Sequence, residues 1–552
     1  MAALRAAGVE PLLARIYAAR GVSEAGALER GLDGLPDPEG LPGLDAAAAR
    51  LLAARDRGER VCIVGDYDAD GATGTALAVR GLRALGFPQV AFRVPDRFVH
   101  GYGLSPGIVE DLLDADPPDL IVTVDNGIAS VEGVAAARAA GVDVVVTDHH
   151  LPGAVLPAAA AITNPRLDPA SPFLELAGVG VVFFLLVALR RRLRARGEAE
   201  GVNLAAWLDL VALGTVADVV PLGRPNRVLV EQGLRRMRAG RSCMGIRALA
   251  DVAGRDRAHL RASDLAFALA PRLNAAGRLE DMTLGVELLL TDDPLRARDL
   301  AARLDAINRE RREIEADMSA VAASLAAELP DDWGLCLHDP AWHAGVVGIV
   351  AGRVKERLHR PVVAFAEAEP GVLRGSARSV PGLHVRDAIE TVATRHPTLV
   401  RAFGGHAMAA GLTLATADLA RFARAFDAVV REQLTEADLA RVQLSDGELT
   451  AAELDLTTAR RLETAGPWGA AFPEPVFDGE FEVEDVRVIG EAHVRLRLAK
   501  GSRRGIGAIA FGGVEQGWDA PPSRVRLLYR LEVNRWRGSE QLQLGVVHLE
   551  GA

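Results

Sequence analysis

Short apolar runs alternate with helical stretches between residues 59 and 156. The runs are VCIVG (61–65), LIVTV (120–124) and VDVVVT (142–147). They are rich in β-branched residues and apolar throughout, as strands buried on both faces of a parallel sheet should be. Helical patterns at 72–85 and 131–140 separate them, and a glycine follows each. This alternation predicts an α/β fold with a doubly wound parallel sheet.

Farther along the chain the pattern changes several times. Residues 160–290 have mainly helical spacing, and a stretch with almost no helix breakers follows from 293 to 329. That stretch predicts a long helix, which either connects two domains or lies half-buried on one of them. A second, smaller α/β pattern runs from 334 to 433. After a turn-rich segment at 466–479, five alternating β-branched segments predict a small β-barrel.

These changes divide the chain into five parts. We expect an N-terminal helical segment (1–50), a large α/β domain (51–290), a connecting helix (291–330), a smaller α/β domain (331–440), and a linker with an OB-like barrel (441–552).

The apolar segment 176–189 is too short for a membrane helix, which needs roughly 18 or more apolar residues. We interpret it as a buried core helix with a basic end at RRRLRAR. The chain has three cysteines without CxxC spacing and begins without the apolar core of a signal peptide. These features predict a cytoplasmic protein without disulfides, thiolate metal sites or membrane association.

Positive charge is concentrated near the C-terminus of a chain whose net charge is −11. Between His493 and Arg537 there are ten Arg or Lys residues and three Asp or Glu residues, a net of +7. Nearly all of this charge is arginine, which binds phosphate through paired hydrogen bonds and stacks on bases. Aromatic residues at 511, 518, 529 and 536 are interspersed, although some of them should belong to the barrel core. The barrel is therefore expected to bind a single nucleic-acid strand.

Four acidic or histidine clusters carry the candidate chemistry: GDYDADGATG (65–74), VDNGI (124–128), TDHH (147–150) and ADVVPL (217–222). The first three follow predicted strands, and the carboxyl ends of parallel strands share one edge of a sheet. Any one of these aspartates, taken alone, is more often a helix cap or turn former. Several carboxylates together repel one another unless a cation binds them. Oxygen and imidazole ligands without thiolate predict two Mn²⁺ or Mg²⁺ ions.

In order and separation, these clusters resemble the phosphoesterase motifs of the DHH superfamily. The resemblance implies that Asp68, Asp70, Asp125, His149 and Asp218 are metal ligands, with Asp125 between the two ions. Asp66 would be an accessory ligand, and His150 would face the scissile phosphate. Residues 51–290 would then be the DHH phosphoesterase domain and residues 331–440 a DHHA1-type accessory domain.

Further blocks resemble RecJ-type exonucleases: RLNAAGRL (272–279), WHAGVVGIVAGR (342–353), GSARS (375–379) and GGHAMAAG (404–411). By this resemblance, substrate contacts would come from Arg97, Tyr102, Arg272, Arg278, His343, Ser376, Arg378, Gly404, Gly405, His406, Arg535 and Trp536. Arginine forks and flexible glycine backbone suit phosphate binding. Alone, a Gly–Gly–His sequence is also common in ordinary turns, and His343 is equally compatible with a structural role.

The RecJ resemblance implies metal-dependent 5′→3′ hydrolysis of single-stranded DNA in repair and recombination, with a helicase and a single-strand-binding protein as partners. Two alternatives remain at this point. One is a phosphodiesterase for cyclic dinucleotides or very short oligonucleotides, but many such enzymes carry a histidine at the position of Val64. The other is a nucleic-acid-binding scaffold with a degenerate site, although no ligand position is degraded here. Val64 and Asp66 leave the ligand set of the first metal open.

Overall fold

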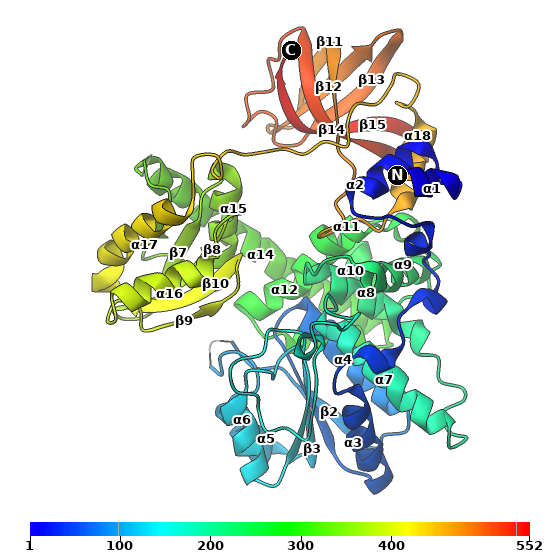
Figure 1. Cartoon of the computed structure of the whole chain (residues 1–552), viewed down its shortest axis with the longest axis vertical. Helices are drawn as coiled ribbons and strands as arrows, with labels where there is room; N and C mark the ends of the chain where they lie inside the picture. The colour runs from blue at the N-terminus through cyan, green and yellow to red at the C-terminus, as the bar shows by residue number, and fades with distance from the viewer. Residues whose placement is uncertain (98, 330, 537) are drawn as a thin grey trace. The chain divides into compact units, whose positions relative to one another are not determined.

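A computed structural model describes residues 1–97, 99–329, 331–536 and 538–552. The chain forms two compact units (Figure 1). Unit 1 comprises Met1–Asn274, Asp281–Ala302 and Leu444–Ala552, and unit 2 comprises Ala275–Glu280 and Arg303–Gln443.

Unit 1 is built on a five-stranded parallel sheet of order β2-β1-β3-β4-β5. Its strands are β1 (Val61–Gly65), β2 (Val90–Arg93), β3 (Leu120–Val124), β4 (Asp143–Thr147) and β5 (Ala161–Thr163). β1 and β3 are buried along their whole length, which explains their uniformly apolar sequences. The three apolar runs of the sequence correspond to β1, β3 and β4. The sheet also contains β2 and β5, and β5 is a three-residue strand in a region expected to be helical.

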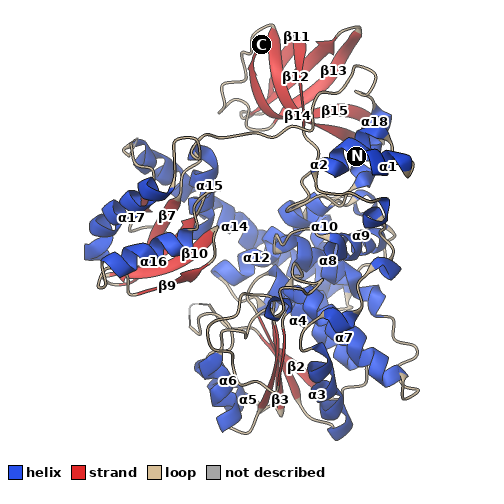
Figure 2. Ribbon diagram, viewed as in Figure 1, coloured by secondary structure: helices blue, strands red, loops and turns tan. Residues whose placement is uncertain are grey.

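Helices cover both faces of this sheet, so the predicted doubly wound α/β fold is confirmed (Figure 2). α5 (Pro106–Ala115) and α6 (Val131–Ala139) lie on one side. α3 (Leu44–Arg57), α4 (Ala69–Ala84) and α7 (Gly178–Arg194) pack with one another on the other side. α7 carries the long apolar segment and is buried over most of its length, as expected of a core helix. Within the described residues, no helix is both long and apolar enough to cross a membrane.

A helical layer follows the sheet. It contains α8 (Leu208–Ala217), α9 (Arg224–Arg238), α10 (Met244–Val252), α11 (Ala262–Asp264), a π-helical turn (Leu265–Leu269), α12 (Ala270–Leu279) and α13 (Thr283–Leu290). The expected long helix is α14 (Pro294–Ala327), with 34 residues. Both α12 and α14 begin in unit 1 and end in unit 2.

Unit 2 contains a mixed sheet of order β6-β7-β8-β10-β9, in which only β6 and β7 pair in parallel. Its elements are β6 (Leu335–His338), α15 (Val347–Leu358), β7 (Val362–Glu369), β8 (Val372–Arg378), α16 (Val385–Arg395), β9 (Ala402–Gly405), β10 (Ala409–Ala415) and α17 (Leu419–Gln433). Separate hydrophobic cores lie on the two faces of the sheet.

The C-terminal strands close into the predicted barrel, in the order β11-β12-β13-β15-β14. They are β11 (Phe477–Ile489), β12 (His493–Lys500), β13 (Arg503–Ala510), β14 (Arg524–Trp536) and β15 (Ser539–Gly551), preceded by α18 (Leu456–Ala465). The N-terminal helices α1 (Ala2–Ala6) and α2 (Pro11–Ala19) belong to the same structure. Leu12 and Ile16 are part of the barrel core, and Tyr17 Oη donates to the Ala465 carbonyl oxygen over 2.8 Å.

Candidate active site

The four acidic and histidine clusters meet at the carboxyl edge of the unit 1 sheet. Asp66, Asp68 and Asp70 follow β1, Asp125 follows β3, His149 and His150 follow β4, and Asp218 caps the end of α8. His149 Nε2 lies 3.0 Å from Asp125 Oδ1 and 3.5 Å from Asp218 Oδ2. Elements that are separate in sequence therefore place their acidic and imidazole groups around one point.

The loop after β1 is held by its own side chains and by α12. Asp68 is the N-cap of α4, where its Oδ1 accepts from the Gly71 N–H over 2.9 Å. Asp66 Oδ1 accepts from the Tyr67 N–H over 2.7 Å. Asn274 Oδ1, from α12, accepts from the Ala69 N–H over 2.7 Å. Asp68 is thus both a helix cap and a member of the cluster, because capping uses only one carboxylate oxygen.

Asp70 binds the N-terminus of α7. Its Oδ2 accepts from the Gly178 N–H over 2.6 Å and its Oδ1 accepts from the Val179 N–H over 3.0 Å. A carboxylate at this position is stabilised by free N–H groups and by the helix dipole. A Cβ atom on Gly178 would lie 2.6 Å from the Asp125 Cβ, so only glycine lets the helix approach both aspartates.

Burial and mutual repulsion disfavour the charged forms of these carboxylates. The pKa values of Asp66 and Asp125 are raised well above the ordinary range by burial and by neighbouring aspartates. The same two causes raise the pKa of Asp70 to about 7 and that of Asp218 to about 9. Burial and the neighbouring His150 lower the pKa of His149 to about 3. Asp125 also has a φ of 61°, an uncommon conformation for a residue other than glycine. Such a cluster needs positive charge between its members.

The donor atoms fit divalent cations. Three overlapping sets have ligand atoms within 4.8 Å of one another: Asp66–Asp68–Asp125, Asp70–His149–Asp218 and Asp125–His149–His150. Asp125 Oδ1 and His149 Nε2 are buried and make no hydrogen bond with any residue that the structure describes. A neutral imidazole lone pair directed at a carboxylate is unfavourable unless a cation lies between them. Carboxylate oxygens with one imidazole match the preferences of Mn²⁺ and, less closely, Mg²⁺.

His150 has a different environment from His149. Its Nδ1 lies 2.7 Å from Asp148 Oδ1. Burial opposes protonation of His150, but the hydrogen bond to Asp148 and the surrounding aspartates outweigh it and raise its pKa to about 9. Adjacent histidines in one motif therefore differ in charge, and His150 supplies a positively charged donor next to the cluster.

Tyr102 and Arg97 extend the site beyond β2. Tyr102 Oη donates to the Asp125 carbonyl oxygen over 3.1 Å and lies 3.2 Å from His150 Nδ1. The Tyr102 ring contacts Tyr67 edge-on, with centroids 6.1 Å apart, and the Arg97 guanidinium lies 4.5 Å above the Tyr67 ring. Both predicted substrate residues thus lie beside the carboxylate cluster in unit 1.

Within unit 2, the predicted substrate residues gather at the N-terminal end of α15. Arg278 Nη1 donates to the Gly345 carbonyl oxygen over 3.1 Å, and His343 Nδ1 accepts from the Gly345 N–H over 3.1 Å. A Cβ on Gly348 would lie 2.9 Å from both Arg378 Nη2 and Ser376 Oγ. These groups surround a helix N-terminus, where the free N–H groups favour an anion.

Three neighbouring strands align Ser376 with glycines of the 404–411 motif across the unit 2 sheet. Ser376 on β8 pairs with Gly411 on β10, which in turn pairs with Gly404 on β9. Gly405 has a φ of 139°, and the following His406 N–H donates to the Ala409 carbonyl oxygen over 2.8 Å. Sheet register therefore aligns motifs that are about 30 residues apart.

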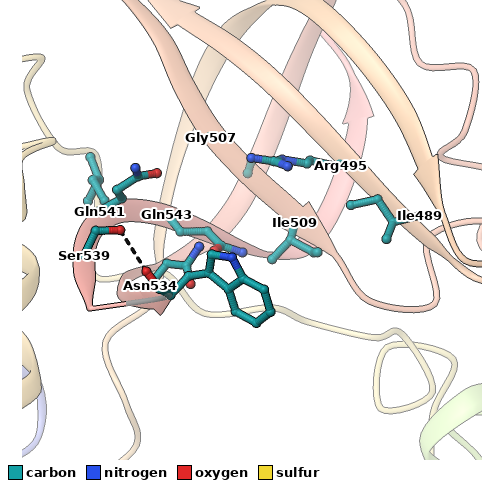
Figure 3. A pocket seen from close by; sticks show the side chains of 11 residues that line it. Ile489, Arg495, Gly507, Ile509, Asn534, Ser539, Gln541 and Gln543 are labelled. Atoms are coloured by element: carbon teal, nitrogen blue, oxygen red, sulfur yellow. Dashed lines mark hydrogen bonds between the residues drawn. The ribbon is translucent and has the colours of Figure 1, made fainter.

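The barrel holds the last two predicted residues in different environments. Arg535 forms a paired salt bridge with Glu463, at 2.7 and 2.6 Å, and a further one with Glu540. Trp536 is 67% exposed and lines a cavity of about 300 Å³ with Arg495, Asn534, Gln541 and Gln543 (Figure 3). The structure therefore brings Arg495, and not Arg535, to the cavity lined by Trp536.

Arg272, a predicted substrate residue, is buried and donates to the Ala268 carbonyl oxygen one turn earlier. Its contact with substrate stays a prediction. Asp148, Asn274 and Tyr67 were not predicted as site residues. Asp148 and Tyr67 lie within motifs that the sequence analysis identified. Their position next to predicted metal ligands could therefore have marked them as site residues. Only the fold shows that Asn274 reaches the loop after β1.

Comparison with known proteins agrees with this architecture. Residues 60–215 match the DHH family, N-terminal domain, residues 318–432 the DHHA1 domain and residues 445–548 the RecJ OB domain. The single-stranded-DNA-specific exonuclease RecJ of Dickeya dadantii (strain 3937) is 52% identical over 98% of this chain and 96% of its own length.

Solved structures give the same result. The crystal structure of RecJ from Thermus thermophilus in complex with Mn²⁺ has a TM-score of 0.84 and 34% identity, covering 100% of this chain and 77% of that one. The structure of RecJ from the same organism in complex with Mg²⁺ has a TM-score of 0.76 and 32% identity, covering 100% of this chain and 76% of that one. With a carboxylate–histidine cluster suited to those ions, a DHHA1 domain and a closed barrel, this chain belongs to the RecJ family of single-stranded-DNA-specific exonucleases.

Proposed function

We propose that this chain is a divalent-metal-dependent exonuclease that hydrolyses phosphodiester bonds of single-stranded DNA from the 5′ end. One observation carries the proposal. Asp125 Oδ1 and His149 Nε2, 3.0 Å apart and without hydrogen-bond partners among the described residues, lie within a cluster of aspartates in a RecJ-family chain. The named activity of the relatives supports the same substrate. The alternative of a cyclic-dinucleotide phosphodiesterase is not favoured, because such an enzyme needs no strand-binding barrel.

Two sets of side chains would hold two ions. Asp66, Asp68 and Asp125 suit one position, and Asp70, His149 and Asp218 suit the other. Ions held by these residues would stabilise the charge that develops on a phosphodiester during hydrolysis and would make an attacking water more acidic. Protonated His150, held by Asp148, donates a hydrogen bond to a non-bridging phosphate oxygen. Hydrogen bonds from the N-terminus of α7 orient Asp70 and partly offset the burial that raises its pKa.

By family resemblance, each unit is proposed to supply contacts to the 5′ end of the strand. Beside the ligands, Tyr102 stacks on the first base and Arg97 binds phosphate. From unit 2, Arg278, Ser376 and Arg378 contact the terminal phosphate, and His343 with the Gly404–His406 turn contacts the next phosphates. A terminal phosphate carries more negative charge than an internal diester, so arginine forks and a hydroxyl prefer it.

The OB-like barrel, within the proposed 441–552 region, holds the incoming strand. Trp536 offers an exposed ring for stacking, and Arg495 lies in the same cavity. The other proposed divisions are 1–50, the DHH domain at 51–290, the connecting helix at 291–330 and the accessory domain at 331–440. By family resemblance, the proposal includes action in DNA repair and recombination with a helicase and a single-strand-binding protein.

End-labelled single strands test the proposal. With Mn²⁺, a strand labelled at its 5′ end should release labelled mononucleotide at once, whereas a 3′ label should remain in a progressively shorter strand. A bulky 5′ block should protect the strand, and the same sequence as a blunt duplex should be stable. Degradation from the 3′ end, or equal degradation of the blocked strand, contradicts the polarity.

A further inference from the structure

A cavity of about 630 Å³ lies within unit 1, apart from the carboxylate cluster. One wall is the segment that follows Asp218, and a second comprises α9 and the π-helical turn. The third is the linker between α18 and β11. Hydrogen bonding of the Leu222 N–H to the Ala470 carbonyl oxygen over 2.8 Å joins the first wall to the third. Arg227 also lies 4.4 Å from the ring centroid of Phe472. These contacts fix the walls relative to one another.

Two large apolar side chains in this cavity are unusually exposed. Phe267 is 78% exposed on the π-helical turn, and Val219 is 69% exposed. Val219 has a φ of 61°, a conformation that is unfavourable for a β-branched residue. Single π-helical turns and strained backbone both occur preferentially at functional sites. Two independent irregularities therefore meet at one cavity.

The cavity wall is rich in arginine. Arg30, Arg235, Arg238, Arg261 and Arg530 line it, against Glu231, Glu463 and Glu474. Glu231 pairs with Arg235 at 2.7 Å and lies 4.0 Å from Arg238, and Glu474 lies 3.4 Å from Arg530. Glu463 pairs with Arg535, which is not part of the lining. The five arginines outnumber the three glutamates, so the lining keeps a formal excess of positive charge beside the exposed apolar surface.

The position of the cavity connects two parts of the site. Val219 follows directly after Asp218, a member of the carboxylate cluster. Arg530, on the opposite side of the cavity, belongs to β14, the strand that carries Trp536. The lining therefore includes residues adjacent to the carboxylate cluster and a residue of the barrel.

We propose that this cavity is a nucleobase-binding subsite for the incoming single strand, with a base against Phe267 and Val219 and its flanking phosphates on Arg238, Arg261 and Arg530. The inference rests on the proposed function. An apolar surface that includes an aromatic ring, flanked by arginines, is the chemistry that binds single-stranded nucleic acid. The volume lies within the range of about 300–1,000 Å³ of small-molecule sites, which accommodates one base with its sugar.

A base-by-base fluorescence scan tests this subsite. A 5′-phosphorylated strand carries one 2-aminopurine, placed at successive positions from the 5′ end, and binds the full-length protein with Ca²⁺ in place of Mn²⁺. In the wild type, one position or two adjacent positions should change fluorescence on binding because the base leaves the DNA stack. Phe267→Ala should abolish that change and leave the others. Leu295→Ala, which removes another exposed apolar side chain of unit 1, serves as the matched control.

Kinetics and stability give a second measurement. Phe267→Ala should raise the KM for a long strand about 10-fold, the effect of losing one stacking contact of about 1–3 kcal/mol. Val219→Gly relieves the backbone strain, so its melting temperature should equal or exceed that of the wild type while its KM for long strands rises. A fluorescence change that persists in Phe267→Ala, or none at any position in the wild type, overturns the subsite. If wild-type protein does not degrade single strands at all, the proposed function itself fails.

Discussion

Asp148 Oδ1 lies 2.7 Å from His150 Nδ1, and the same carboxylate is fixed by three backbone groups. It accepts from the His149 N–H over 2.7 Å, from the His150 N–H over 3.1 Å and, through Oδ2, from the Ile128 N–H over 2.9 Å. Its pKa is lowered despite burial because His150 and these N–H groups favour the anion. The buried anion in turn holds the His150 imidazole in one orientation.

Asp148→Asn should therefore reduce kcat by about 10- to 100-fold, the usual effect of losing a buried partner of a site histidine. The metal-binding groups remain in place, so the affinity for Mn²⁺, measured by calorimetry, should change little. Asp168→Asn, which alters an aspartate in an exposed loop, is the control. An unchanged kcat, or a parallel loss of Mn²⁺ affinity, would contradict a role of Asp148 in positioning His150.

Asp125→Ala or His149→Ala should abolish hydrolysis and leave the fold intact. Each substitution removes a metal ligand, and the first also removes one charge from a crowded carboxylate cluster. Without metal, the melting temperature of Asp125→Ala should thus equal or exceed that of the wild type. Adding Mn²⁺ should raise the wild-type value and have a smaller effect on either variant. Wild-type turnover by either variant at saturating Mn²⁺ would contradict the assignment of Asp125 and His149 as ligands of two metal ions.

Binding of long single strands should depend on Trp536 and Arg495. Trp536→Ala should weaken binding by about 1–3 kcal/mol through the loss of stacking, with little change in salt dependence. Arg495→Ala should make the salt dependence shallower by roughly one phosphate contact. Truncation of the chain at Pro467 is a less specific test, because loss of the barrel would expose Leu12 and Ile16 of α2. If the wild type, Trp536→Ala and Arg495→Ala bound long single strands with equal affinity and equal salt dependence, this cavity would not be the binding site for the strand.

A 5′-phosphorylated strand should be cut faster than a 5′-hydroxyl strand, and Arg278→Ala should narrow that difference. The Arg278 side chain is held by the Gly345 carbonyl oxygen at the N-terminal end of α15, beside Ser376 and Arg378. Initial rates on the two substrates measure the ratio. Arg401→Ala removes an exposed arginine of the same unit and should leave the ratio unchanged.

Tyr529→Phe should leave DNA binding unchanged. Tyr529 is fully buried between Phe477 and Phe481, and its hydroxyl has no hydrogen-bond partner among the residues described. Removing a buried, unsatisfied hydroxyl should leave the free energy of unfolding unchanged or raise it by about 1 kcal/mol. Thermal and denaturant unfolding measure this effect. A large loss of stability would indicate an unrecognised partner of the hydroxyl.

The sequence predicted the sheet and its acidic edge because both depend on local patterns. β1 and β3 begin and end at the predicted residues, since a strand buried on both faces must be continuously apolar. The clusters at Asp66–Asp70 and Asp125 follow from where those strands end. By contrast, β5 has only three residues, too few for a periodic signal.

Features that depend on long-range contacts were not predictable. Asn274 reaches Ala69 across 205 residues of sequence, and no local pattern encodes such a pairing. Arg535 and Trp536 are adjacent in sequence, yet one forms ion pairs with Glu463 and Glu540 while the other lines a cavity. Successive residues of a strand face opposite sides, so the partner of each depends on strands elsewhere in the barrel.

The position of α2 has a consequence for synthesis on the ribosome. Leu12 and Ile16 are made first, but their partners in the barrel core begin at Leu449, more than 400 residues later. The Arg20–Asp446 salt bridge at 2.7 Å closes the same large loop. Until the barrel strands emerge, the apolar face of α2 stays exposed on the nascent chain, where it is a binding site for chaperones and a risk for aggregation. A chain arrested before residue 449 lacks every barrel strand and therefore keeps the apolar face of α2 exposed.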